Sequence, residues 1–312
     1  MTIMLYILYI IAALILAVLI AYFVFPKTLY GWMKSLIRSR GGMRQKSIKV
    51  GDDVWAYLEG GSDNGVPVVL LHGFGGDKDN WSIYAPNITK HHRLIAPDLP
   101  GFGENDRSFD RDYDIHTQSR RVKAFIDAMG ISKCHIGGNS MGGFIALQFA
   151  MDYPETTASL TLFNNAGVVG ADKSELQIAA EKGENALALA DVSDVDRLMA
   201  FVSHKPVRLP KNFRKLFFAE ADAHREVLDK IFWQIVGAAI DKPLNDHLDK
   251  VAVPTLIIWG RHDRLIDVSC ADVLNKGVRD SELVIFEETG HVPMIEKPKE
   301  VSAVHMAFLA KH

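Results

Sequence analysis

The sequence has few cysteines, no excess of basic residues, and no repeat or low-complexity tract beyond its first residues. Its two cysteines, Cys134 and Cys270, cannot form a multi-disulfide framework and lack the spacing of zinc ligands. The formal net charge of −3 excludes the basic surface that binding to nucleic acid requires. Hydrophobic residues at 48% and charged residues at 23% are close to the globular average. These limits predict a globular protein without a nucleic-acid partner.

Charge is also missing from a long stretch at the N-terminus. Ile3–Phe25 is a run of 23 residues without a charged side chain. A helix of that length spans about 34 Å, enough to cross a hydrocarbon core about 30 Å thick. A cleaved secretory signal would begin with basic residues and end in a small-residue cleavage site, and Tyr22–Pro26 offers no such site. We therefore expect a retained transmembrane anchor over residues 1–28. A processed signal, which would give a secreted or cell-surface protein, is the alternative.

Basic residues follow the apolar run, and no acidic residue appears before Asp52. They are Lys27, Lys34, Arg38, Arg40, Arg44, Lys46 and Lys49. Without these seven, the 35 basic residues fall to 28 against 38 acidic ones, so the rest of the chain carries about −10. The positive-inside rule then places the remainder of the chain in the cytoplasm. Residues 29–46 are expected to form a basic juxtamembrane linker.

Beyond the linker, short apolar runs alternate with amphipathic segments. The expected strands are Ser47–Val50, Val54–Glu59, Pro67–His72, Arg93–Pro97, Cys134–Asn139, Ala158–Phe163, Thr255–Trp259 and Glu282–Phe286. Helical patterns cover Ile115–Met129, Met141–Tyr153 and Pro298–Lys311. This alternation indicates an α/β fold with a mostly parallel sheet and helices on both faces. We expect a core of residues 47–170 and 250–312, with a helical cap of residues 171–249 inserted between its two parts.

The pentapeptide Gly138-Asn139-Ser140-Met141-Gly142 fits the G-x-S-x-G pattern of a nucleophile elbow. Such an elbow is a sharp turn between a strand and a helix that exposes the serine oxygen above the sheet. Its glycines avoid collisions with the neighbouring backbone. The motif alone is weak, but here it follows an expected strand and opens an expected helix. Ser140 is therefore the candidate nucleophile.

A second motif, His72-Gly73-Phe74-Gly75-Gly76, ends an earlier strand. It matches the loop that supplies an oxyanion donor in enzymes with a nucleophile elbow. A tetrahedral intermediate needs two preorganised backbone N–H donors, and those of Phe74 and Met141 are the natural pair. We expect His72 to brace this loop by hydrogen bonding. Trp81 is expected to pack behind the loop.

A serine nucleophile needs a base that is itself oriented by a carboxylate. His291 lies in the glycine-containing loop after the last expected strand, and Asp263 lies in the loop after the preceding one. Asp267, on the same loop as Asp263, is the rival acid. The chain order Ser, Asp, His is that of α/β-hydrolases. No H-E-x-x-H motif or complete dinucleotide-binding motif is found, so we expect neither a metal nor a cofactor.

From about Lys49 to the C-terminus, the chain resembles an α/β-hydrolase of the lipase and esterase branch. The N-terminal anchor, the segment Asn212–Phe217, and the segments Val253–Gly260 and Leu265–Ser269 narrow the resemblance. They are similar to membrane-anchored monoacylglycerol lipases of the hydrolase-domain type and to Moraxella and Psychrobacter lipases. The resemblance implies an integral membrane serine hydrolase that cleaves acylglycerol esters, with Ser140, Asp263 and His291 as its triad. The oligomeric state is not predicted.

Large apolar side chains crowd one part of the expected cap. Phe213, Leu216 and Phe217, with Val292 beside the candidate base, are the expected substrate contacts, where they would line an acyl tunnel or meet the bilayer. Packing of the cap on the sheet is an equally good explanation of the cap residues.

Two other functions stay open at this point. The elbow also resembles that of carbon–carbon bond hydrolases acting on ring-cleavage products. Those enzymes usually carry Trp after the histidine, where this chain has Val292, and they lack an anchor. The other is a hydrolase-fold receptor with little turnover. Dehalogenases and epoxide hydrolases use an aspartate nucleophile, so Ser140 excludes them.

Overall fold

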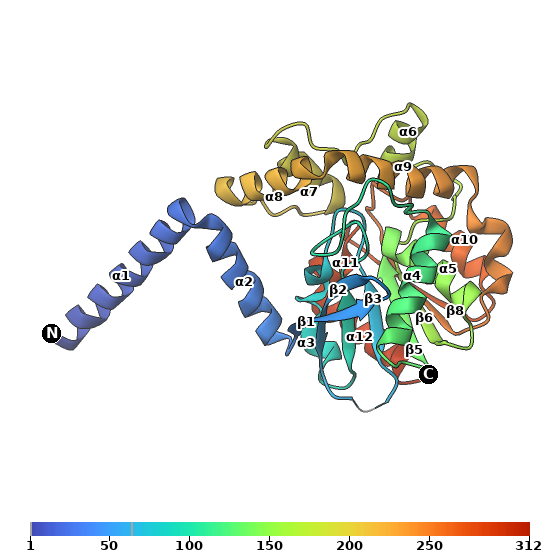
Figure 1. The fold of residues 1–312 in the computed structure, drawn as a ribbon, viewed down its shortest axis with the longest axis horizontal. Coiled ribbons are helices and arrows are strands. Elements are labelled where there is room, and N and C mark those ends of the chain that lie inside the picture. The colour runs from blue at the N-terminus through green and yellow to red at the C-terminus, as the bar shows by residue number, and fades with distance from the viewer. Residues whose placement is uncertain (1, 64) are drawn as a thin grey trace.

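Within residues 2–63 and 65–312, which the computed structural model describes, eight strands form one sheet in the order β1-β2-β4-β3-β5-β6-β7-β8. Their bounds are Arg44–Val50 (β1), Asp53–Gly60 (β2), Val68–Leu71 (β3), Leu94–Pro97 (β4), Cys134–Asn139 (β5), Thr157–Phe163 (β6), Thr255–Gly260 (β7) and Ser281–Phe286 (β8). β2 is antiparallel to β1 and β4, and the other neighbouring pairs are parallel. The predicted, mostly parallel sheet is confirmed (Figure 1).

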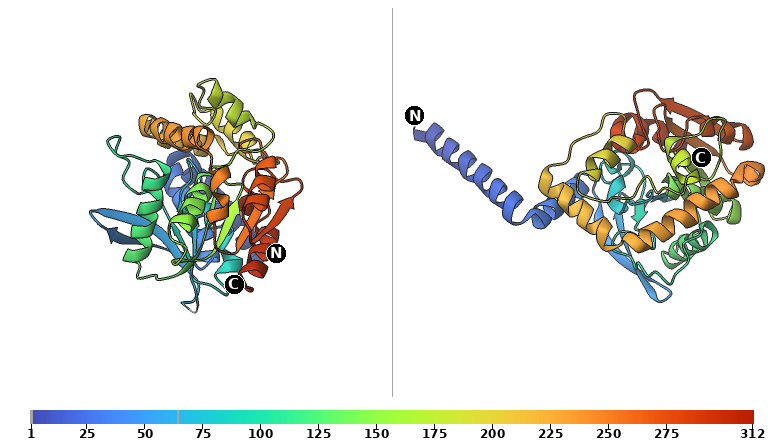
Figure 2. Two further views of the ribbon diagram at one scale, coloured as in Figure 1. Left: turned by 90° about the vertical axis from the view of Figure 1, so that its right-hand side faces the viewer. Right: turned by 90° about the horizontal axis from the view of Figure 1, so that it is seen from above.

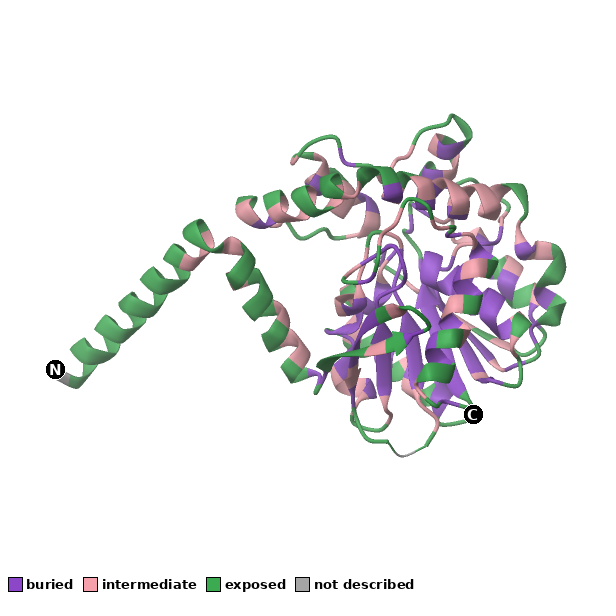
Figure 3. Ribbon diagram, in the orientation of Figure 1, coloured by how far each residue is buried: buried purple, intermediate pink, exposed green. Residues whose placement is uncertain are grey.

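Helices cover both faces of this sheet. They are η1 (Lys78–Trp81), α3 (Ala85–Ile88), α4 (Ile115–Ala128), α5 (Met141–Asp152), α10 (Ser269–Gly277), α11 (Pro293–Glu296) and α12 (Pro298–Leu309). Successive residues of a strand point to opposite faces. In β3, Val69 and Leu71 join the core under α4, α5 and α10, whereas Val68 and Leu70 join the core under α3 and α12. The central strands are therefore buried on both sides, as Figure 3 shows.

Two of the predicted core helices, α4 and α5, begin where the sequence places them and end within one residue of the prediction. The short elements η1, α3, α10 and α11 were not predicted. Each has nine residues or fewer. So short an element shows too little of the 3.6-residue period to be recognised in a sequence.

The N-terminal segment forms two helices, α1 (Thr2–Val24) and α2 (Pro26–Arg40), with the chain breaking direction at Phe25 (Figure 1). Of the described helices, α1 is the one that is long and apolar enough to cross a membrane, with a mean hydropathy of 3.0 over Ile3–Val24 and no buried residue. Residues 29–46, expected as a linker, lie mostly in α2 and reach into β1.

The cap comprises α6 (Glu175–Glu181), α7 (Asp194–Val202), α8 (Lys211–Ala223), α9 (Arg225–Asp241) and η2 (Leu244–Lys250). In Figures 1 and 2, α9 crosses above the carboxyl ends of the parallel strands, and α8 extends toward the bend between α1 and α2. The Tyr22 hydroxyl lies 3.1 Å from the Asn212 N–H, and the Asn212 amide donates to the Tyr22 carbonyl. The cap thus contacts the end of α1 as well as the sheet.

His305 joins α12 to the sheet from inside the core. Its ring nitrogens lie 2.7 Å from the Tyr84 hydroxyl and 3.1 Å from the Thr161 hydroxyl. Burial lowers the pKa of His305 to about 3. Because the unfolded chain has a histidine pKa near 6.5, the neutral buried ring stabilises the fold fully above that pH, and this contribution is lost as the pH falls toward 3.

We therefore expect His305 alone to remove about 2.7 kcal/mol of stability between pH 7.5 and 4.5, at about 1.4 kcal/mol per pH unit below 6.5. Thermal unfolding midpoints measured across this range test the effect. His305→Gln should lose less of its own stability on acidification than the wild type does. The exposed His116→Gln control should follow the wild type, and an unchanged pH dependence in His305→Gln would show that another group is responsible.

Candidate active site

Ser140 lies in a strained turn between β5 and α5. Its backbone has φ 55° and ψ −119°, a conformation that residues other than glycine rarely adopt. A Cβ at Gly138 would lie 2.3 Å from the backbone of Gly142, so only glycine fits there. The turn has the shape expected of a nucleophile elbow, with Ser140 half-buried above the central strand.

His291 and Asp263 form a buried hydrogen-bonded pair. The distance from His291 Nδ1 to Asp263 Oδ2 is 2.8 Å, and both side chains are almost completely buried. The other oxygen of Asp263 accepts the backbone N–H groups of Leu265 and Ile266. The rival acid, Asp267, instead accepts the N–H of Ser269 at the start of α10. The structure therefore pairs His291 with Asp263.

Asn139 connects the turn of Ser140 to the loop of His291. Its side-chain amide donates to the His291 carbonyl at 3.0 Å and to the Phe163 carbonyl at 3.0 Å. Since Asn139 precedes Ser140 directly, these bonds hold the His291 backbone beside the elbow. The carboxyl ends of β5, β7 and β8 thus bring Ser140, Asp263 and His291 to the same edge of the sheet.

Asn164 is a further residue of the site that sequence reasoning missed. It lies at the end of β6 with φ 44°, a conformation that asparagine tolerates better than most residues. Its amide nitrogen donates to Asp263 Oδ2 at 2.6 Å, and its amide oxygen accepts the Gly260 N–H. The only sequence signal was a polar residue directly after an apolar strand.

Glu296, also missed, joins the loop of His291 to the cap. One carboxylate oxygen accepts the Gly290 N–H and the other accepts the His204 N–H, each at 2.8 Å. Nearby, the His291 N–H donates to the Val202 carbonyl at 2.9 Å. The cap segment 202–204 therefore fixes the backbone on which His291 is carried.

The expected oxyanion loop passes directly against the elbow. A Cβ at Gly73 would lie 3.2 Å from Ser140 Cβ, and the Gly76 N–H closes a turn onto the Gly73 carbonyl. Phe74 is the second residue of that turn. Met141 is the first residue of α5, a position whose N–H has no acceptor within the helix.

His72 braces this loop as predicted. The Leu99 N–H donates to His72 Nε2 at 2.9 Å, so the proton lies on Nδ1, which donates to the Gly73 carbonyl at 2.8 Å. Complete burial lowers the pKa of His72, so the ring stays neutral and keeps this tautomer. Trp81 is fully buried and packs on Tyr84 and Phe163, also as expected.

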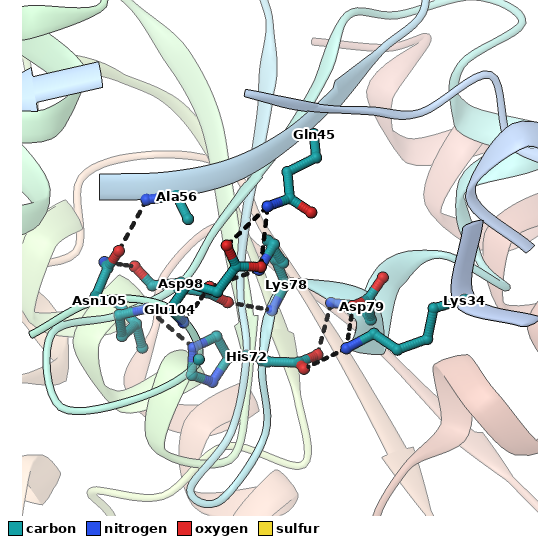
Figure 4. Close-up of polar contacts among 12 residues, drawn as sticks. Lys34, Gln45, Ala56, His72, Lys78, Asp79, Asp98, Glu104 and Asn105 are labelled. Atoms are coloured by element: carbon teal, nitrogen blue, oxygen red, sulfur yellow. Dashed lines mark hydrogen bonds and ion pairs between the residues drawn. The ribbon is translucent and has the colours of Figure 1, made fainter. Parts of the chain in front are cut away.

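Below this loop, a buried ion pair holds two turns together (Figure 4). Lys78 Nζ lies 2.7 Å from Asp98 Oδ2 and 2.8 Å from Glu104 Oε1. Asp98 also accepts the backbone N–H groups of Lys78 and Glu104. Asp98 is therefore a structural carboxylate.

The predicted substrate contacts are not brought together at the triad. The centre of the Phe213 ring lies 5.6 Å from the ring centres of both Tyr22 and Tyr30, so Phe213 faces the N-terminal helices. Leu216 and Phe217 are half-buried on the same helix, and Val292 packs on the core beneath the sheet edge. The sequence did not reveal that α2 would lie beside α8 and supply the aromatic neighbours of Phe213.

Other cap residues lie over the oxyanion loop instead. The ring of Phe74 packs edge-on against that of Phe232 of α9, with 5.9 Å between the ring centres. Phe232 belongs to a cluster that also contains Leu176, Phe201 and Leu265. Trp233 and Val236 of α9 pack on the same cluster. This cluster, from α6, α7, α9 and the acid loop, is the part of the cap that packs on Phe74.

A family model described as the alpha/beta hydrolase fold matches residues 66–298, so the chain belongs to that family. Lipase 1 of Psychrobacter immobilis is 33% identical over 87% of this chain and 86% of its own length. A monoacylglycerol lipase of Xenopus laevis is 30% identical over 89% of this chain and 84% of its own length. A solved structure described as a membrane phospholipase A is 38% identical with a TM-score of 0.88, covering 98% of both chains.

These similarities confirm the expected resemblance to bacterial lipases and monoacylglycerol lipases. Within the α/β hydrolases, the chain is a carboxylic ester hydrolase of the lipase and esterase type.

Because Glu296 accepts two backbone N–H groups that hold the loop of His291, its replacement should slow the reaction. Glu296→Gln keeps the size of the side chain but presents an NH₂ group to one of the two backbone N–H donors. A charge-assisted hydrogen bond of this kind contributes about 1.5–3 kcal/mol, so loss of its positioning effect should lower kcat for an ester roughly tenfold or more. Steady-state kinetics test this, with the exposed Glu300→Gln as control. An unchanged kcat in Glu296→Gln would mean that Glu296 does not position His291.

Proposed function

We propose that the protein hydrolyses acyl esters through a covalent acyl-enzyme on Ser140. The observation that supports this most directly is the 2.8 Å His291–Asp263 pair at the sheet edge that carries the strained turn of Ser140. A base oriented by a buried carboxylate, beside a serine on a strand–helix turn, is the arrangement that activates a hydroxyl for acyl transfer.

In the first half of the proposed reaction, His291 Nε2 takes the proton of Ser140 as Oγ attacks the ester carbonyl. Asp263 holds the proton on Nδ1 and stabilises the imidazolium that forms. The tetrahedral intermediate collapses when the bond to the alcohol oxygen breaks and His291 returns the proton to that oxygen. Water then attacks the acyl-serine with His291 again as base, releasing the carboxylic acid and restoring Ser140.

The oxyanion of each tetrahedral intermediate is assigned to the backbone N–H groups of Phe74 and Met141. Both belong to turns that are fixed before the substrate arrives, one by the His72 brace and one by the start of α5. Such a donor typically contributes roughly 3–4 kcal/mol to catalysis. Phe232 and the other apolar residues over Phe74 are the proposed contacts for the acyl chain.

We infer that the substrate is an acyl ester of a glycerolipid. The relatives named above include lipases, a monoacylglycerol lipase and a membrane phospholipase A, whose names share the acyl ester bond of a lipid. In this chain the apolar helix α1 has no buried residue over Ile3–Val24 and is followed by basic residues. An anchor of this kind would keep the catalytic domain where lipid esters are concentrated.

We further propose that α1 spans the membrane with the catalytic domain on the cytoplasmic side. The support is the charge asymmetry, since the seven basic residues between positions 27 and 49 have no acidic neighbour before Asp52.

Ester hydrolysis by the full-length protein in detergent tests the acyl-enzyme proposal. Ser140→Ala should lower kcat by roughly 10⁴-fold or more, because the nucleophile and its base act as a unit. Ser35→Ala, an exposed serine on α2, should leave kcat unchanged. Assays with monoacylglycerols, lysophospholipids and short p-nitrophenyl esters rank the substrate classes. Full activity in Ser140→Ala would refute the mechanism. Turnover of ring-cleavage products without ester turnover would favour the carbon–carbon hydrolase, and no turnover at all would favour the receptor.

Labelling of a single introduced cysteine tests the topology. Cys134 and Cys270 are both buried, so a membrane-impermeant maleimide meets little background in the folded protein. His312→Cys places a thiol at the exposed C-terminus. In intact cells this thiol should react only after the membrane is opened. Reaction in intact cells would place the catalytic domain outside.

A further inference from the structure

Two basic residues of α2 hold it against the catalytic domain. The guanidinium of Arg38 forms a bidentate ion pair with Asp79, with Nε 2.5 Å from Oδ1 and Nη2 2.6 Å from Oδ2. Lys34 Nζ lies 2.6 Å from Asp79 and 2.9 Å from Asp77 (Figure 4). The side chains of Arg38 and Asp79 are each only 13% exposed, so this contact is more shielded from solvent than a surface ion pair.

Their acidic partners begin the helix that follows the candidate oxyanion turn. Asp77 caps η1 by accepting the Asp79 N–H, and it stands three residues after Phe74. Gly76 joins the two elements, and a Cβ there would lie 2.5 Å from the side-chain amide of Asn80. The turn and η1 are therefore in direct contact through Gly76 and the Asn80 side chain.

A second chain of contacts leads from α2 to the same loop, and Figure 4 shows its part from Gln45 to Asp98. The remaining guanidinium nitrogen of Arg38, Nη1, donates to the Gln45 side-chain oxygen. The Gln45 amide donates to Glu104, and Glu104 pairs with the buried Lys78. Lys78 in turn pairs with Asp98. The residue after Asp98, Leu99, donates its N–H to His72, the brace of the oxyanion loop.

The charges in this contact stay ionised. Burial alone would raise the pKa of Asp79, but hydrogen bonds from Arg38 and Lys34 outweigh burial and lower it. For Lys78, burial opposes the charged form, and the ion pairs with Asp98 and Glu104 raise its pKa above the ordinary value. Removal of Arg38 would thus leave a mostly buried carboxylate short of a partner.

We propose that α2 is a positioning element of the active site, an inference that rests on the proposed function. Lys34 and Arg38 fix η1 through Asp77 and Asp79, and η1 fixes the turn that presents the Phe74 N–H to the oxyanion. Residues 34 and 38 precede the segment 66–298 that matches the family model. The segment that follows the anchor helix therefore contributes to the rate of the reaction as well as to location.

Kinetics of the full-length protein in detergent test this with a short, water-soluble p-nitrophenyl ester, whose binding does not depend on the membrane. A displacement of about 1 Å in a catalytic group can cost roughly a hundredfold in rate. Arg38→Gln and the isosteric Asp79→Asn should therefore each lower kcat about tenfold or more, with KM within about twofold of the wild type. Arg38→Lys, which keeps the charge but not the fork, should recover part of the loss.

Arg40→Gln is the matched control, because Arg40 is an exposed cation on the same helix. Titration of active sites with a fluorophosphonate corrects kcat for any protein that has not folded. The proposal is overturned if Arg38→Gln and Asp79→Asn keep the kcat of the wild type, if their loss appears only in KM, or if Arg40→Gln loses as much.

Hydrogen exchange separates failure of this proposal from failure of the proposed function. Backbone amides of residues 73–80 should exchange faster in Arg38→Gln than in the wild type and Arg40→Gln, whether or not the protein hydrolyses the ester. Unchanged exchange in Arg38→Gln overturns the positioning role. By contrast, a wild type without ester turnover, or an active Ser140→Ala, counts against the proposed function alone.

Discussion

The site depends on one close approach of two backbones at the end of the central strands. A Cβ at Gly142 would lie 2.3 Å from the Leu71 carbonyl oxygen and 2.4 Å from that of His72, so the start of α5 touches the end of β3. Glycine permits this contact, and Ser140, two residues before Gly142, has the strained positive φ of the elbow. The contact also brings Met141, the residue between them, close to the strand end that leads into the loop of Phe74. The nucleophile and its two candidate oxyanion donors are therefore carried by two segments that meet at this contact.

The rest of the site is held by polar contacts that cross between elements. Asn139 and Asn164 join β5 and β6 to the loops of His291 and Asp263, and Glu296 joins the loop of His291 to the cap. These groups are mostly buried, where a hydrogen bond is electrostatically stronger and an unmade one is costly. The geometry of the pair His291–Asp263 is therefore set by several elements at once.

Much of this could be predicted from the sequence, because the decisive signals are local. The elbow needs glycines at fixed offsets around Ser140, and apolar runs of strand length mark the parallel sheet. The contacts of Asn164 and Glu296 could not be predicted, since each joins residues far apart in the chain. The packing of Phe213 on the N-terminal helices could not be predicted for the same reason: its aromatic neighbours, Tyr22 and Tyr30, are almost two hundred residues away. Periodicity shows that a helical face is apolar but not which surface covers it.

The N-terminal segment that holds the proposed anchor also contacts the catalytic domain. Helix α2 contacts the helix that follows the oxyanion turn, and α8 contacts the end of α1. The central claim, however, is the covalent step at Ser140. Rapid quenching during turnover of a slow ester, followed by mass spectrometry of the whole protein and its peptides, tests it most directly. One acyl group should be added, and it should lie on the peptide that contains Ser140. Continued turnover with no covalent adduct, or with an adduct on another residue, would contradict it.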